Sequence, residues 1–200
     1  FDKKECGWKE VDTRKKEEIF NISQKYMNLL NNSKTEREFV KNAKKLADEN
    51  GYKDIMAFQE LKPGDKIYFI NREKSMYLAI IGEEPIENGM HIIGSHIDSP
   101  RLDLKPNPLY EDTELAYFKT HYYGGIKKYQ WTTIPLSIHG VIVKTNGEKI
   151  EINIGEKETD PIFTITDLLP HLADEQMNKK LKNGIDGEDL NLLIGSIPYN

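Results

Sequence analysis

The sequence has a single cysteine, no surplus of basic residues and no long apolar run, and each shortage excludes a class of protein. With only Cys6 available, an internal disulfide and a zinc site made of several thiolates are both excluded. Acidic residues outnumber basic ones by 33 to 28, which gives a formal net charge of -5. Sequence-independent binding to nucleic acid requires a clustered basic surface, so we expect no nucleic-acid partner.

A membrane location is not expected either. No segment approaches the run of roughly 18 apolar residues that a membrane-spanning helix requires. The first ten residues, FDKKECGWKE, lack the apolar stretch of a signal peptide. Since disulfides are also ruled out, we expect a cytoplasmic protein with no membrane partner. Hydrophobic residues make up 38% of the chain and charged residues 30%, which is typical of a globular protein with a core.

Two helices are expected at the start of the chain. Between Asp12 and Asn31, apolar residues recur at spacings of three and four, the pattern of an amphipathic helix. Thr35 and Glu38 then form a capping-box signature. The helix that this signature opens is expected to end at Asn50–Gly51.

Apolar strands follow these helices. We expect a hairpin with strands at 66–71 and 76–81, joined by a polar turn. The segment Met90–Gly94 is predicted to be a further strand, buried in the interior of a sheet. Helices followed by apolar strands indicate an α/β layer.

The second half of the chain is predicted to be β-rich and to form a separate unit, so we expect domains at 1–105 and 106–200. Asn146–Gly147 lies between two alternating runs, which is the strongest short-range signal for a β-hairpin. Helix is expected to return after residue 165, with Thr166 or Asp167 as its N-cap.

His96 and Asp98 carry the chemistry that stands out in the sequence. They follow the predicted strand Met90–Gly94, and open α/β sheets place ligands beyond the ends of their strands. Residues two apart in an extended segment point to the same side, so a metal-binding histidine and its orienting carboxylate are one interpretation. A surface hydrogen bond is the other, since zinc usually needs three or four protein ligands.

The chain contains, in this order, the segments GSHIDSPRLDLKP, YYGGIKKYQWTTIPLSIHGVIV and DPIFTITDLLPHLADE. Together they resemble the aspartyl aminopeptidase family, whose members are two-metal exopeptidases on an α/β fold. GSHIDSPRLDLKP is similar to the family's first metal-ligand motif. YYGGIKKYQWTTIPLSIHGVIV is similar to its Tyr-Gly-Gly segment and the return strand after it. DPIFTITDLLPHLADE resembles a third segment that contains a proline and a histidine.

The resemblance implies roles for three residues. His96 would bind one of two zinc ions (Zn²⁺), and Asp98 would orient it. His171 would lie in a β-rich inserted dimerisation domain and would reach the active site of a neighbouring subunit. The fold implied is the peptidase-type α/β sheet with N-terminal helices, followed by that insertion. The partners implied are peptide substrates and further copies of the chain in a large homo-oligomer.

The family's remaining metal ligands and its general base lie further along the chain than this sequence extends. We therefore expect the 200-residue polypeptide alone to be inactive. The family name implies cleavage after acidic N-terminal residues, for which Lys127, Lys128 and Arg101 are candidate contacts. The segment GIKKYQWTTIPL departs from the WFDRDL type of the animal branch, so a broader specificity stays open.

Two further hypotheses remain. The second hypothesis is a noncatalytic assembly module derived from such a peptidase, and the third is a hydrolase in which His96 and Asp98 activate Ser95 or Ser99. Neither serine lies in a Gly-x-Ser-x-Gly elbow, which disfavours the hydrolase. Among the other histidines, His91 is expected to be a core residue of its strand, and two more are interpreted as structural: His121 and His139.

Overall fold

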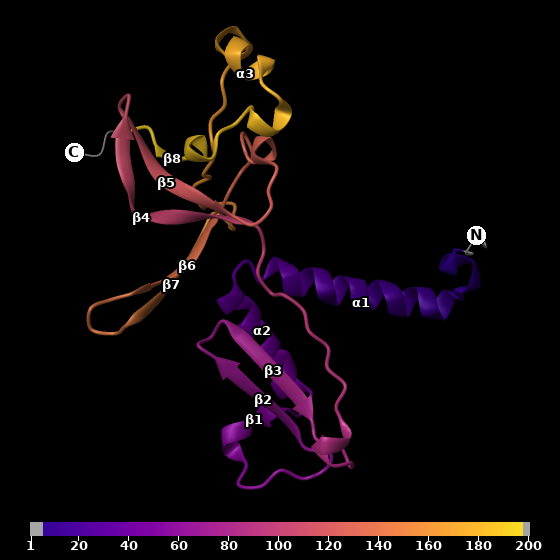
Figure 1. Cartoon of the computed structure of the whole chain (residues 1–200). Coiled ribbons are helices and arrows are strands. Elements are labelled where there is room, and N and C mark those ends of the chain that lie inside the picture. The colour runs from indigo at the N-terminus through magenta and orange to yellow at the C-terminus, as the bar shows by residue number, and fades with distance from the viewer. Residues whose placement is uncertain (1–5, 198–200) are drawn as a thin grey trace. The chain divides into compact units, whose positions relative to one another are not determined.

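The structure is a computed structural model that describes residues 6–197, and these divide into two compact units. The first unit ends at Asp98 and the second begins at Ser99 (Figure 1). A domain boundary after residue 105 stays a prediction. Residues 1–5, on which part of the signal-peptide argument rests, and residues 198–200 lie outside the described part. Within that part, no helix combines the length and the apolar character needed to cross a membrane.

The first unit consists of helices followed by a small sheet. Its elements are α1 (Thr13–Asn31), α2 (Glu36–Glu49), β1 (Lys53–Asp54), β2 (Lys66–Asn71) and β3 (Ser75–Ile80). β2 lies in the middle of the sheet, parallel to β1 and antiparallel to β3. α2 covers one face of this sheet (Figure 1). The buried side chains of the unit's core come from α2 and β2: Val40, Ala47, Ile67 and Tyr68.

The predicted helix boundaries are confirmed, and side chains near the ends account for them. The Asp12 carboxylate accepts a hydrogen bond from the Lys15 amide at 2.7 Å and so caps α1. At α2, the Glu38 amide donates to the Thr35 hydroxyl at 3.3 Å, and the Thr35 amide donates to the Glu38 carboxylate at 3.0 Å. Gly51 follows α2 with a φ of 82°, the left-handed conformation that ends many helices.

The predicted strand at Met90–Gly94 is wrong for the described residues. The segment forms no strand, and Ile92 and Ile93 are 79% and 99% exposed. His91 is exposed as well, so it is not a core histidine. The physical reason is that a strand requires a neighbour to complete its hydrogen-bond ladder, and residues 6–197 supply none here.

The second unit is β-rich, as predicted. Its elements are β4 (Arg101–Asp112), β5 (Leu115–Tyr123), β6 (Ile138–Val143), β7 (Lys149–Ile154), α3 (Asp174–Asn178) and β8 (Leu192–Gly195). β5 lies between β4 and β8, antiparallel to both, while β6 and β7 form a separate hairpin. The two units together confirm the expected mixed α/β fold with N-terminal helices.

The sheet of the second unit packs against a small apolar core. Its buried members lie at and before β8: Ile165, Ile185, Leu190 and Leu192. The edge strand β4 contains Pro106 and Pro108, and its register against β5 shifts between Leu104 and Leu109. An edge strand tolerates proline because one side of it needs no ladder hydrogen bonds.

The two remaining local predictions differ in outcome. Gly147 turns the β6–β7 hairpin with a φ of 85°, as the Asn-Gly signal predicts. The N-cap prediction is wrong, because α3 begins only at Asp174 and its N-cap is Ala173 rather than Thr166 or Asp167. Pro170 explains why no helix begins at Thr166 or Asp167. The residue before a proline is held in extended backbone, and Leu169 accordingly has φ -66° and ψ 151°.

Candidate metal centre and the His171 loop

The structure brings His96 and Asp98 together at the end of the first unit. The Nδ1 atom of His96 lies 3.1 Å from Oδ1 of Asp98 and 2.9 Å from the main-chain oxygen of Asp98. The His96 side chain is 84% exposed and that of Asp98 is 35% exposed. The imidazole is therefore tethered on one side and open to solvent elsewhere.

This contact determines which nitrogen of His96 is free to bind a metal. Both partners of Nδ1 are oxygen acceptors, so Nδ1 is the donor, and in the neutral imidazole the lone pair lies on Nε2. A histidine held by a carboxylate through one nitrogen is the usual arrangement around protein-bound zinc.

His96 and Asp98 fit the roles of one zinc ligand and the carboxylate that orients it. Across residues 6–197, no three histidine, cysteine, aspartate or glutamate side chains are grouped so that they could hold a metal ion. A complete zinc shell would need further ligands from outside these residues. The metal-binding role of His96 therefore stays a prediction.

His171 lies in the second unit, in a segment that we call the His171 loop, residues 168–173. The middle of the loop is a single 3₁₀ turn, Pro170–Leu172. His171 is exposed, and so are its leucine neighbours Leu168, Leu169 and Leu172, at 54%, 69% and 71%. The loop thus presents a histidine surrounded by apolar side chains that nothing covers among the described residues.

Asp167, directly before the loop, accepts three hydrogen bonds. Its Oδ1 atom accepts from the Gln176 side chain at 3.0 Å and from the Leu168 amide at 2.8 Å. Its Oδ2 atom accepts from the Thr132 hydroxyl at 3.3 Å. The pKa of Asp167 is lowered, chiefly by the Gln176 hydrogen bond and against the effect of burial, so the side chain is a carboxylate at neutral pH.

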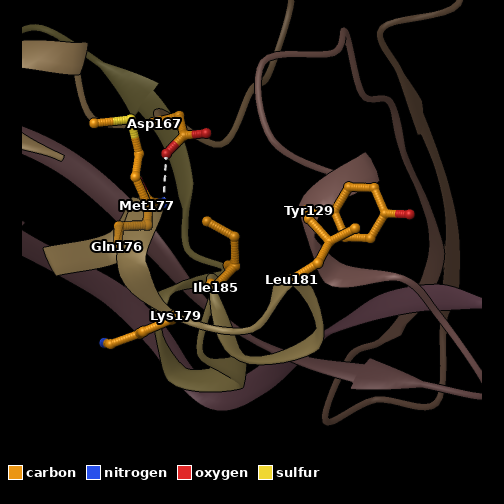
Figure 2. A pocket seen from close by; sticks show the side chains of 8 residues that line it. Tyr129, Asp167, Gln176, Met177, Lys179, Leu181 and Ile185 are labelled. Carbon is orange, nitrogen blue, oxygen red and sulfur yellow. Dashed lines mark hydrogen bonds between the residues drawn. The ribbon is translucent and has the colours of Figure 1, made fainter. Parts of the chain in front are cut away.

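Asp167 and Gln176 also lie on the wall of a pocket of about 370 Å³ in the second unit. Figure 2 shows the hydrogen bond between them at one side of the pocket, with Tyr129 and Leu181 at the other. The remaining wall is largely apolar and includes Ile185. Sequence reasoning missed this arrangement, since it treated Asp167 only as a helix cap.

The structure gives His121, His139 and the candidate cation Arg101 specific contacts. Nε2 of His139 lies 2.9 Å from Oε1 of Glu156, while the ring of His121 stacks on that of a neighbouring tyrosine. The Arg101 guanidinium lies 4.1 Å from the centre of the Tyr123 ring and 2.8 Å from the Asp103 carboxylate. The charge of Arg101 is thus already engaged within the second unit.

Comparison with known proteins decides the family. Residues 29–196 match the family described as aminopeptidase I zinc metalloprotease (M18). The chain belongs to the M18 family. A probable M18 family aminopeptidase 1 of Clostridium acetobutylicum is 53% identical over 196 residues, which cover 96% of this chain and 42% of that protein. The chain thus spans less than half the length of this M18 relative.

Solved M18 structures agree with the fold. The crystal structure of the M18 aminopeptidase of Thermotoga maritima has a TM-score of 0.89 at 45% identity, covering 98% of this chain and 42% of that one. Aminopeptidase I of Borrelia burgdorferi has a TM-score of 0.84 at 45% identity, covering 98% and 44%. A S. cerevisiae protein described as the mApe1 dodecamer has a TM-score of 0.64 at 22% identity, which shows a shared fold alone.

Proposed function

We propose that the protein carrying this chain is a zinc-dependent aminopeptidase that removes N-terminal residues from peptides. The observation that carries the proposal is the M18 match over residues 29–196, which includes His96, Asp98 and His171. The contact between His96 and Asp98 supports it independently, because a zinc ligand and its orienting carboxylate require such a contact.

In this proposal His96 binds zinc through Nε2, and Asp98 holds the Nδ1 proton. Asp98 thereby fixes the tautomer and the ring orientation and raises the basicity of the ligating nitrogen. When bound, zinc supplies a Lewis acid for attack by water on a peptide carbonyl. Within this chain the two residues bind and orient, while the general base and the other ligands come from outside it.

The second unit has a different role, namely self-association into a large homo-oligomer. The exposed leucines around His171 suit a contact with another subunit, since apolar side chains are typical of the centres of such interfaces. His171 then reaches the active site of a neighbouring subunit. The yeast protein of the same fold, described as a dodecamer, is consistent with such an assembly.

Peptides are the proposed substrates, with acidic N-terminal residues either preferred or accepted within a broader range. Lys127 and Lys128 remain candidate contacts for an acidic side chain. Arg101 is a weaker candidate because Tyr123 and Asp103 already engage its charge. Assays with aspartyl and leucyl substrates separate the two versions of the proposal.

The first test measures zinc binding in two polypeptides. One is the 200-residue chain, and the other is a chimera in which the chain is joined to the portion of the C. acetobutylicum relative that it does not match. We expect the chimera to bind zinc tightly and to cleave peptides, and the 200-residue chain to do neither. In the chimera, Asp98→Ala is expected to weaken zinc binding about 10- to 100-fold, and His96→Ala to weaken it further.

His121→Ala is the matched control, because His121 is an exposed histidine on β5 that has no role in the proposal. It should leave zinc binding and turnover unchanged. Equal losses in His121→Ala and His96→Ala would contradict the metal role of His96. A chimera without zinc or turnover would favour the alternative of a noncatalytic assembly module, and zinc-dependent turnover by the 200-residue chain would show that it needs no further ligands.

A further inference from the structure

The ends of the His171 loop are fixed, whereas its middle is not packed. Ile165, three positions before the loop, and Ala173, its last residue, are 1% and 4% exposed. Between them, the apolar side chains of the loop are turned to solvent. Side-chain packing therefore does little to stabilise one conformation of the loop, and hydrogen bonds are needed to hold it.

Asp167 and Gln176 form a hydrogen bond that joins the two ends of the His171 loop. Gln176 lies nine positions after Asp167, so their bond of 3.0 Å joins the chain before the loop to the helix after it. The other carboxylate oxygen of Asp167 accepts from Thr132, which is 6% exposed and belongs to the buried framework of the unit. The carboxylate thus connects three segments: the start of the loop, α3 and the turn that ends at Thr132. Figure 2 shows the bond to Gln176 of α3.

We propose that the hydrogen bond between Asp167 and Gln176, called the clasp below, positions His171 for its role at a neighbouring active site. The inference rests on the proposed function of His171. Asp167 is a positioning residue, not a catalytic one, since it acts through the loop. A carboxylate suits this position because its two oxygens accept all three hydrogen bonds without presenting a donor of their own.

The clasp itself is tested in the 200-residue chain by amide hydrogen exchange at Leu172, whose amide donates to the Leu169 oxygen at 2.9 Å. Gln176→Leu should accelerate this exchange by about tenfold, the effect of losing a hydrogen bond to a charged group. Gln176→Lys should restore slow exchange, because the ammonium group also donates to the carboxylate. Glu175→Leu, a change at the preceding residue of the same helix, should have no effect.

Unchanged exchange in Gln176→Leu would overturn the clasp. So would equal acceleration in the leucine and lysine variants, because the effect would then come from altered helix packing. β5 amides serve as an internal reference, since general unfolding of the unit would accelerate them too.

The positioning role is tested by turnover in the chimera. Gln176→Leu should lower kcat/KM about tenfold, in the same direction as His171→Ala. The two changes combined should lower kcat/KM no further than His171→Ala alone, because a displaced loop affects turnover only by moving His171. A larger loss in the double variant would overturn the positioning role. If His171→Ala leaves turnover unchanged, the proposed role of His171 fails, whereas the exchange experiment still decides the clasp.

Discussion

Gly155 occupies a position that no other residue fits. Its φ is 107°, and a Cβ atom there would lie 2.9 Å from Cα of Ser137. Its amide also donates to the Asp160 carboxylate at 2.9 Å, which is the main reason why the pKa of Asp160 is lowered. The backbone conformation and the close approach of Ser137 both require glycine here, whereas any residue except proline could donate the amide hydrogen bond.

Gly155→Ala should therefore lower the free energy of unfolding of the second unit by about 2 kcal/mol or more. Denaturant titration measures this change. Gly140→Ala is the matched control, because Gly140 lies in β6, which pairs with the strand before Gly155, and it has negative or extended φ and open space around its Cβ position. Equal effects of the two substitutions would show that strain at Gly155 is not the cause.

At the scale of single elements, α2 offers the clearest test of whether nearby side chains determine where a helix begins. Thr35→Ala removes the hydroxyl that accepts from the Glu38 amide and should cost about 1 kcal/mol of unfolding free energy. Thr35→Ser keeps the hydroxyl and should stay close to the original stability. The comparison is made by denaturant unfolding of the first unit, and a loss in the serine variant as large as in alanine would contradict the capping role.

Elements with short-range signals were predictable from the sequence. The capping box at Thr35 and the turn at Asn146–Gly147 each depend on residues within a few positions, and both are confirmed. The contact between His96 and Asp98 was predictable for the same reason, since two positions separate them.

Elements that depend on distant partners were not predictable. The apolar pattern of Met90–Gly94 fits a strand, but a strand also needs a neighbour to pair with, and its own sequence does not show one. Asp167 satisfies the rule for an N-cap, yet Pro170 delays the helix, and the carboxylate accepts from Thr132, 35 positions earlier. No short sequence pattern predicts a contact between residues so far apart in the chain.

At the scale of the whole molecule, the first unit exposes more apolar surface than its fold explains. α1 has no buried residue, and its stripe includes Ile22 and Tyr26, which are 67% and 59% exposed. The segment Met90–Ile93 adds further exposed apolar side chains. Soluble domains rarely leave such large surfaces uncovered. Since the chain spans 42% of its C. acetobutylicum relative, we expect the rest of an M18 protein to cover this surface.

Ile93→Asp tests this expectation by comparing two contexts. In the 200-residue chain the side chain is 99% exposed, so the substitution should change the unfolding free energy by no more than about 0.5 kcal/mol. In the chimera the same change would bury a charge and should cost at least about 2 kcal/mol. Ile67→Asp, at a side chain already buried in β2, should be destabilising in both contexts. Denaturant titration of the four variants decides the matter, because a harmless Ile93→Asp in the chimera would mean that Met90–Ile93 stays exposed in the longer protein.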